Sequence, residues 1–93
     1  ACSKPVITTN FGGQVDFCNE DNSWIIDGKL TPVTWELSYE GINWLTPDLN
    51  KLKKVMRDTY NNRELIKQKG INALETAKSF QWENSALKIK ELI

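Results

Sequence analysis

The sequence contains no histidine and only two cysteines, Cys2 and Cys18, among its 93 residues. Without histidine, the chain cannot supply a Ser-His-Asp or Cys-His catalytic group by itself. The two cysteines form no CxxC pair, so the ligand spacings of zinc sites are also absent. We therefore expect no bound metal and no other cofactor. A disulfide between the two cysteines stays open, but the lack of a signal-like segment and of an N-x-[ST] sequon favours a reduced, cytoplasmic setting.

Long apolar runs and an overall charge are missing as well. No uninterrupted apolar run exceeds three residues, so the sequence predicts no transmembrane helix. Twelve basic and twelve acidic residues cancel overall, but residues 1–48 hold seven acidic and two basic residues, and residues 49–93 hold ten basic and five acidic ones. The basic residues are spread rather than clustered with aromatics, which is typical of solvated helix faces and a poor match to a nucleic-acid surface.

Short strand-like segments fill the first half of the chain. Residues 5–9 predict a strand, because proline is tolerated at the first position and β-branched residues follow. Apolar and polar residues do not alternate there, which is typical of a strand buried on both faces of a parallel sheet. Residues 14–18 predict one helical turn and residues 23–26 a second strand. Asp27-Gly28 then predicts a hairpin turn, with residues 30–35 as the return strand.

After residues 36–45, where we expect a loop with little extended structure, the pattern becomes helical. Thr46 is a good N-cap residue and Pro47 a good first helical residue, and the helix is expected to end near Tyr60. Asn61 and Glu64 then resemble a capping box that starts a second helix. In that helix Gly70 lies near the apolar stripe and predicts a close helix contact or a kink. A third helix is expected from Trp82, with its apolar residues at positions 82, 86, 89 and 93 on one face.

This order of elements defines the expected fold. Two or three short strands followed by three helices indicate an α/β fold, in one incomplete domain over residues 1–93 with a strand and loop half (1–45) and a helical half (46–93). Two or three strands are too few for a stable parallel sheet. We therefore expect a partial Rossmann-like unit whose first strand lacks neighbours and has an exposed edge, which could drive formation of a homodimer.

Three segments also carry a family resemblance. Residues 1–13 read Ala-Cys-Ser-Lys-Pro-Val-Ile-Thr-Thr-Asn-Phe-Gly-Gly, residues 44–49 read Trp-Leu-Thr-Pro-Asp-Leu, and residues 80–86 read Phe-Gln-Trp-Glu-Asn-Ser-Ala. In this order and spacing they resemble the A-C-G-K-P-V-I-A-T…G-G, W-x-x-P-D and F-S-W-E…A segments of group 1 (family four) glycosyltransferases. The resemblance spans nearly the whole chain. Ser3 replaces the usual glycine, Gln81 replaces the usual serine, and Asp16 matches the acidic residue after Gly-Gly only loosely.

The resemblance implies a role within a larger enzyme. Such enzymes have the GT-B architecture, two Rossmann-like domains facing a cleft, and they transfer a sugar from a nucleotide-sugar donor with retention, usually without a metal. This chain would be the C-terminal part of the donor-binding domain of a full-length, hexosyl-type transferase. The family's pair of glutamates, its upstream basic residues and its N-terminal acceptor domain are missing from these 93 residues. We therefore expect the chain alone to contain no catalytic residue and to be inactive.

The candidate site is the loop that follows residues 5–9. Thr9, Asn10, Gly12 and Gly13 could line the donor cleft, since ligands of α/β sheets bind outside the carboxyl ends of the strands. The two glycines could equally form only a tight turn. Tryptophans at positions 24, 35 and 44 could stack on sugars, although packing explains them better.

The expected partners follow from the same interpretation. They are a nucleotide-sugar donor in the full-length enzyme and the remainder of its chain, with no nucleic acid. The resemblance also allows peripheral association of the parent with the cytoplasmic face of a membrane. The alternative function is a small α/β protein-interaction module with a basic helical half.

Overall fold

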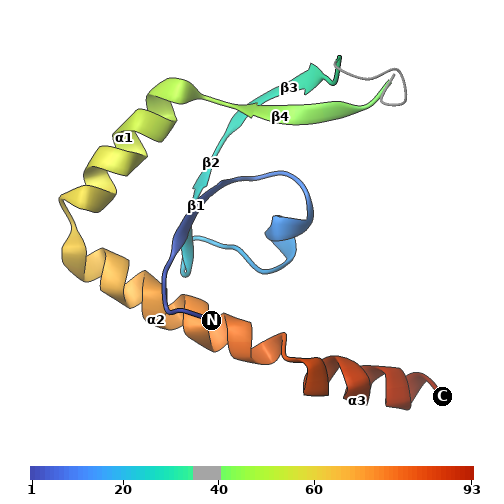
Figure 1. Cartoon of the computed structure of the whole chain (residues 1–93). Coiled ribbons are helices and arrows are strands. Elements are labelled where there is room, and N and C mark those ends of the chain that lie inside the picture. The colour runs from blue at the N-terminus through green and yellow to red at the C-terminus, as the bar shows by residue number, and fades with distance from the viewer. Residues whose placement is uncertain (35–40) are drawn as a thin grey trace.

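The computed structural model describes residues 1–34 and 41–93 and confirms the α/β order of the chain (Figure 1). Strand β1 (Val6–Thr9) leads through the short 3-10 helix η1 (Gly13–Asp16) to β2 (Ser23–Ile26). Two further strands and three helices follow: β3 (Gly28–Pro32), β4 (Asn43–Pro47), α1 (Leu49–Tyr60), α2 (Arg63–Ser79) and α3 (Trp82–Leu92). The described residues thus form four short strands, where the sequence predicts two or three.

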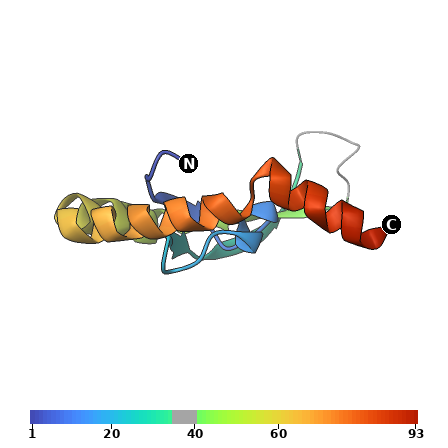
Figure 2. The same cartoon turned by 90° about the horizontal axis from the view of Figure 1, so that it is seen from below.

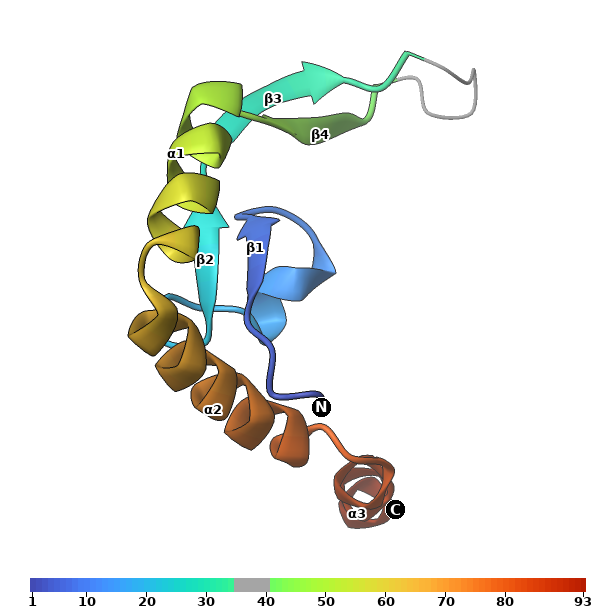
Figure 3. The same ribbon diagram turned by 60° about the vertical axis from the view of Figure 1, so that its left-hand side comes forward.

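Strands β1 and β2 form a parallel pair. Val6 pairs with Ser23 and Thr9 with Ile26, so both strands end at the same edge of the sheet (Figure 3). Among the described residues, no strand pairs with the other edge of β1. Val6 is 47% exposed, so this strand is covered by its own chain only in part.

The predicted hairpin around Asp27-Gly28 is wrong. Strand β2 passes through Asp27 directly into β3, which pairs antiparallel with β4 in a separate two-stranded sheet (Figure 1). We call this second sheet, residues 28–32 with 43–47, the β-arm. Gly28 allows the backbone of β4 to approach β3 closely and does not form a turn. A Cβ at this position would overlap the backbone carbonyl of Thr46. The expected loop over 36–45 is therefore a strand from Asn43 onward, and residues 35–40, including Trp35, lie outside the described residues.

Two predicted helix starts are displaced along the chain. Thr46 and Pro47 end strand β4, and the N-cap of α1 is Asp48, whose carboxylate accepts hydrogen bonds from the backbone N–H groups of residues 50 and 51. Asn61 is the C-cap of α1, and the N-cap of α2 is its neighbour Asn62, which accepts from Leu65 N. Asp and Asn are as good at these positions as the residues predicted from sequence, so local propensity could not decide between adjacent candidates.

Helix α2 crosses the amino ends of the parallel strands. Gly70 is buried there, and a Cβ at this position would overlap the backbone carbonyl of Ser3, whose hydroxyl donates to Gly70 O at 3.1 Å. The glycine therefore allows a close approach, as predicted, but to the segment that precedes β1 rather than to another helix.

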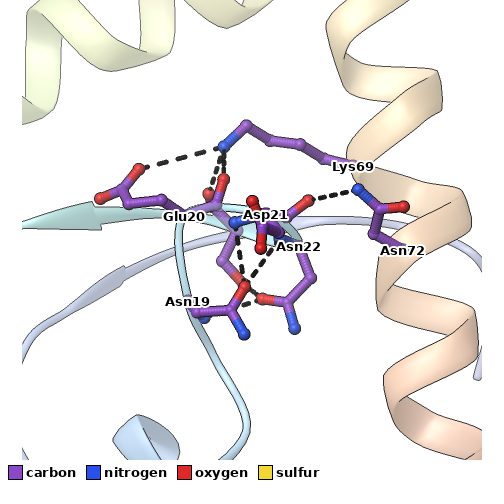
Figure 4. Close-up of polar contacts among 7 residues, drawn as sticks. Asn19, Glu20, Asp21, Asn22, Lys69 and Asn72 are labelled. Carbon is purple, nitrogen blue, oxygen red and sulfur yellow. Dashed lines mark hydrogen bonds and ion pairs between the residues drawn. The ribbon is translucent and has the colours of Figure 1, made fainter.

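Lys69, beside Gly70, joins α2 to the turn before β2 (Figure 4). Its side chain is 9% exposed, and Nζ donates to the backbone carbonyl of Ser23 at 2.8 Å and to that of Glu20. The Glu20 carboxylate lies 4.0 Å from Nζ, and the Trp24 ring centroid lies 4.9 Å away. Asn72 also donates to the carbonyl of Asp21. Polar side chains of helix α2 thus hold the start of β2.

Helix α3 extends away from the parallel strands at the end of the chain (Figure 1). Its apolar residues are largely exposed: Trp82 is 89% exposed, Ile89 60% and Ile93 102%. Trp82 therefore does not anchor the packing within this chain, and the apolar face of α3 is largely uncovered. The N-cap residue of α3, Gln81, makes no side-chain capping hydrogen bond.

The molecule is flat and has a small core. Its extents are 41 × 40 × 16 Å, and Figure 2 shows the thin dimension. Among the described residues, the buried apolar side chains are Ile26 and Val33. The accessible surface is 7602 Å², against roughly 5500 Å² for a compact protein of 10.7 kDa. The elements therefore resemble one layer of a larger domain more than a closed domain.

Candidate functional site

The predicted site residues lie together at the carboxyl edge of the parallel pair. Thr9 is the last residue of β1, and Asn10 N donates to the carbonyl of Ile26, the last residue of β2, at 3.3 Å. Residues 9–13, which we call the β1 loop, begin at this edge (Figure 3). The loop therefore occupies the place where open α/β sheets bind ligands.

The two glycines of the β1 loop differ in what they allow. Gly12 has φ +97°, in the region that favours glycine, and a Cβ there would lie 2.9 Å from the Gln14 side-chain oxygen. Gly13 has no positive φ, and a Cβ there would meet nothing within 4 Å. Gly12 is thus required by the loop conformation itself, as the turn interpretation predicts. Gly13 offers an open approach to the backbone, as cleft lining would need.

A residue that the sequence did not single out organises this loop. The side-chain amide of Gln14 donates to Thr9 O and Thr9 Oγ1, each at 3.3 Å, and to Phe11 O. Its partners lie only three and five residues earlier in the chain. Such a local contact depends on the backbone path of the loop, and nothing in the spacing of the residue types indicates it.

A second group of polar residues lies where β2 passes into the β-arm. Lys51 Nζ and the Asp27 carboxylate are 3.4 Å apart, but both side chains are more than half exposed, so the pair adds little stability. These two residues line a shallow hollow of about 370 Å³ with Asp48 and residues of both arm strands. Asp27 and Lys51 are paired there and Asp48 caps α1, whereas Lys29, which also lines the hollow, makes no ion pair among the described residues.

An apolar hollow lies at the opposite end of the strands. It measures about 450 Å³, and Val6, Phe17, Ala73 and Phe80 line it together with Ala1. The rings of Phe17 and Phe80 meet edge to face, with their centroids 6.0 Å apart. This hollow faces the amino ends of β1 and β2 and is separate from the β1 loop.

Cys2 and Cys18 are both free thiols. Within residues 1–34 and 41–93, no three His, Cys, Asp or Glu side chains gather as metal ligands. In the same residues, none of the helices combines the length and apolar character needed to cross a bilayer.

Comparison with known proteins shows a relationship to a glycosyltransferase. The chain is 33% identical over 92 residues to an uncharacterized glycosyltransferase of Methanocaldococcus jannaschii. The match covers 99% of this chain and 21% of that protein, so the chain spans about a fifth of the relative's length. No family model matches the sequence, and no solved structure matches it. The predicted relationship to glycosyltransferases is thereby confirmed, while the group 1 family, the retaining mechanism and the nucleotide-sugar donor stay predictions.

Proposed function

We propose that this chain is the C-terminal part of the donor-binding domain of a retaining, nucleotide-sugar-dependent glycosyltransferase of group 1, with the GT-B architecture. The observation that carries the proposal is the match to the archaeal glycosyltransferase along 99% of the chain. Two segments at opposite ends of the chain, residues 1–13 and 80–86, resemble group 1 enzymes. They are the reason why we propose group 1 among the glycosyltransferases. The longer protein that contains this chain is called the parent below.

The flat shape of the chain agrees with a position inside a larger sheet. Strand β1 is paired on one edge only in the described residues, and Val6 is half exposed. A parallel strand whose residues do not alternate between apolar and polar normally lies inside a sheet that is covered on both faces. In the parent, another strand would continue the sheet beyond β1 and extend the carboxyl edge on which the β1 loop lies.

In this proposal the β1 loop lines the donor cleft. Thr9 and Asn10 lie at the carboxyl edge, and the open surroundings of Gly13 would let a donor approach the backbone closely. The catalytic groups and the basic residues that neutralise the leaving diphosphate would come from the rest of the parent, because stabilising a developing diphosphate requires cationic or N–H donors. The chain alone would therefore bind donor weakly and transfer no sugar.

A protein-interaction module, the alternative from sequence, is not favoured. It explains the exposed apolar residues of α3 equally well, but it gives no reason for the match with a glycosyltransferase along nearly all of the chain.

The parent protein provides the test. Purified parent, incubated with a panel of nucleoside-diphosphate hexoses and simple glycoside acceptors, should release nucleoside diphosphate and form a product whose anomeric configuration, read by NMR, matches that of the donor. The 93-residue chain is the control and should release none. Inversion of configuration would exclude the retaining assignment, and no turnover with any sugar nucleotide would exclude the proposed donor class.

The role of the β1 loop is tested by Gly13→Ala in the parent. The added methyl group meets no atom of this chain, so the melting temperature should not change. If a donor approaches the backbone at Gly13, the methyl group should raise the KM for the donor roughly tenfold, a usual effect of one misplaced methyl group in a pocket. An unchanged KM would show that the glycine serves only the turn.

A further inference from the structure

Gln14 makes the contacts that hold the β1 loop in shape. One amide group, partly exposed at the start of η1, meets three oxygen atoms: the Thr9 carbonyl, the Thr9 hydroxyl and the Phe11 carbonyl. A side-chain amide nitrogen carries two hydrogens, so at least one of them is shared between two of these three oxygens. The contacts span the chain reversal between the end of β1 and η1, which is the segment that the sequence assigns to the donor cleft.

The loop backbone and the Gln14 side chain depend on each other. A Cβ at residue 12 would lie 2.9 Å from the Gln14 side-chain oxygen, closer than real Cβ atoms come, and Gly12 holds φ +97°. An alanine at residue 12 would therefore disturb the backbone and push the Gln14 amide away from its acceptors. Gly12 and Gln14 act as one unit, whereas Gly13 beside them is unobstructed.

The contacts of Gln14 leave the backbone at Gly13 open. The carbonyls of Thr9 and Phe11 accept from the amide, whereas a Cβ at Gly13 would meet nothing within 4 Å. A loop with a preset shape binds a ligand more tightly than one that must order itself on binding, because the ordering lowers the affinity.

We propose that Gln14 is a positioning residue for donor binding, which acts by holding the β1 loop with Gly13 open to the donor. This inference rests on the proposed function. It assigns to Gln14 no contact with the reacting atoms. Loss of the amide should therefore weaken donor binding and leave the chemical step intact.

The test compares Gln14→Leu and Gln14→Glu with wild type in the full-length parent. Leucine keeps much of the volume and removes the donor, whereas a carboxylate has acceptors only and would face three oxygens. Val15→Thr, at the exposed neighbouring position, is the matched control. Both Gln14 variants should raise the KM for the donor about five- to tenfold, as expected for one or two lost hydrogen bonds, and leave kcat within about twofold.

A second readout needs no catalysis. In the absence of donor, hydrogen exchange of the backbone amides in residues 11–15 should be faster in both Gln14 variants than in Val15→Thr and wild type. If Gly12 and Gln14 are one unit, Gly12→Ala combined with Gln14→Leu should raise the KM by less than the product of the two single effects.

The outcomes separate this inference from the proposed function. If the parent transfers sugar and the Gln14 variants keep the wild-type KM, the inference is overturned and the function stands, whether or not exchange is faster. A lower kcat at unchanged KM would also overturn it, because it would place Gln14 in the chemical step. If the wild-type parent transfers no sugar, the function fails and this inference with it, and the exchange rates then report only on loop order.

Discussion

At the scale of single residues, Lys69 is the buried charged residue among the described residues. It is buried in a chain with few buried apolar side chains, and its partners are two backbone carbonyls, a carboxylate and an aromatic ring. Buried polar groups are tolerated only when they are paired, and each buried side-chain polar atom of the described residues does have a partner. Lys69 therefore takes the place of water as the hydrogen-bond donor to the carbonyls of Glu20 and Ser23.

Lys69→Met in the parent should lower the free energy of unfolding by about 1–3 kcal/mol, because it keeps most of the apolar stem and leaves the carbonyls of Glu20 and Ser23 without their donor. Urea unfolding followed by tryptophan fluorescence would measure it. The matched control is Lys67→Met on the exposed face of α2, which should change little. Equal effects of the two substitutions would contradict the assigned role of Lys69.

At the scale of elements, sequence patterns predicted what local chemistry determines. Strands β1 and β2, the turn at η1 and the three helices were predicted within one or two residues, because β-branched runs and helical periodicity are local signals. The β-arm was missed because the partner of β3 lies beyond residue 40, and a pairing across that distance leaves no local pattern. The hairpin predicted at Asp27-Gly28 was wrong for the same reason. Gly28 is required by the close approach of Thr46 and not by a turn.

The candidate site divides in the same way. Thr9 and the glycines could be predicted as site residues because the end of a buried-type strand followed by Gly-Gly is a sequence signal. Gln14 could not be predicted, because the role proposed for it depends on where the loop carbonyls of Thr9 and Phe11 point.

Helix α3 offers a prediction at this scale. Its N-cap, Gln81, has an extended backbone conformation but makes no capping hydrogen bond with its side chain. Gln81→Ser should place a hydroxyl within reach of the first free N–H groups and stabilise the helix by about 1 kcal/mol. Circular dichroism of the 93-residue chain would show higher helicity and a higher melting temperature. Gln81→Ala lacks an acceptor and should give no gain.

At the scale of the whole molecule, the uncovered apolar surface predicts self-association of the isolated chain. The edge of β1 that has no strand partner in the described residues and the exposed apolar residues of α3, among them Trp82, belong to the same thin layer. Exposed strand edges and large apolar patches promote association. Sedimentation velocity of the 93-residue chain should show dimers or larger species whose share rises with concentration, while the parent should not associate through these surfaces. A chain that stays monomeric at high concentration would count against the open edge.

The 16 Å thickness of the molecule also bears on its calorimetry. The heat-capacity change on unfolding follows the apolar surface that water newly reaches, and it amounts to about 1.1–1.4 kcal/mol/K for a compact chain of this length. A single layer already exposes part of that surface while folded, since its accessible surface of 7602 Å² exceeds the roughly 5500 Å² of a compact chain. A scan of the isolated chain should therefore give a step below this range, with a broad transition. Under the proposed function, the deficit relative to a compact chain would measure how much apolar surface the rest of the parent covers.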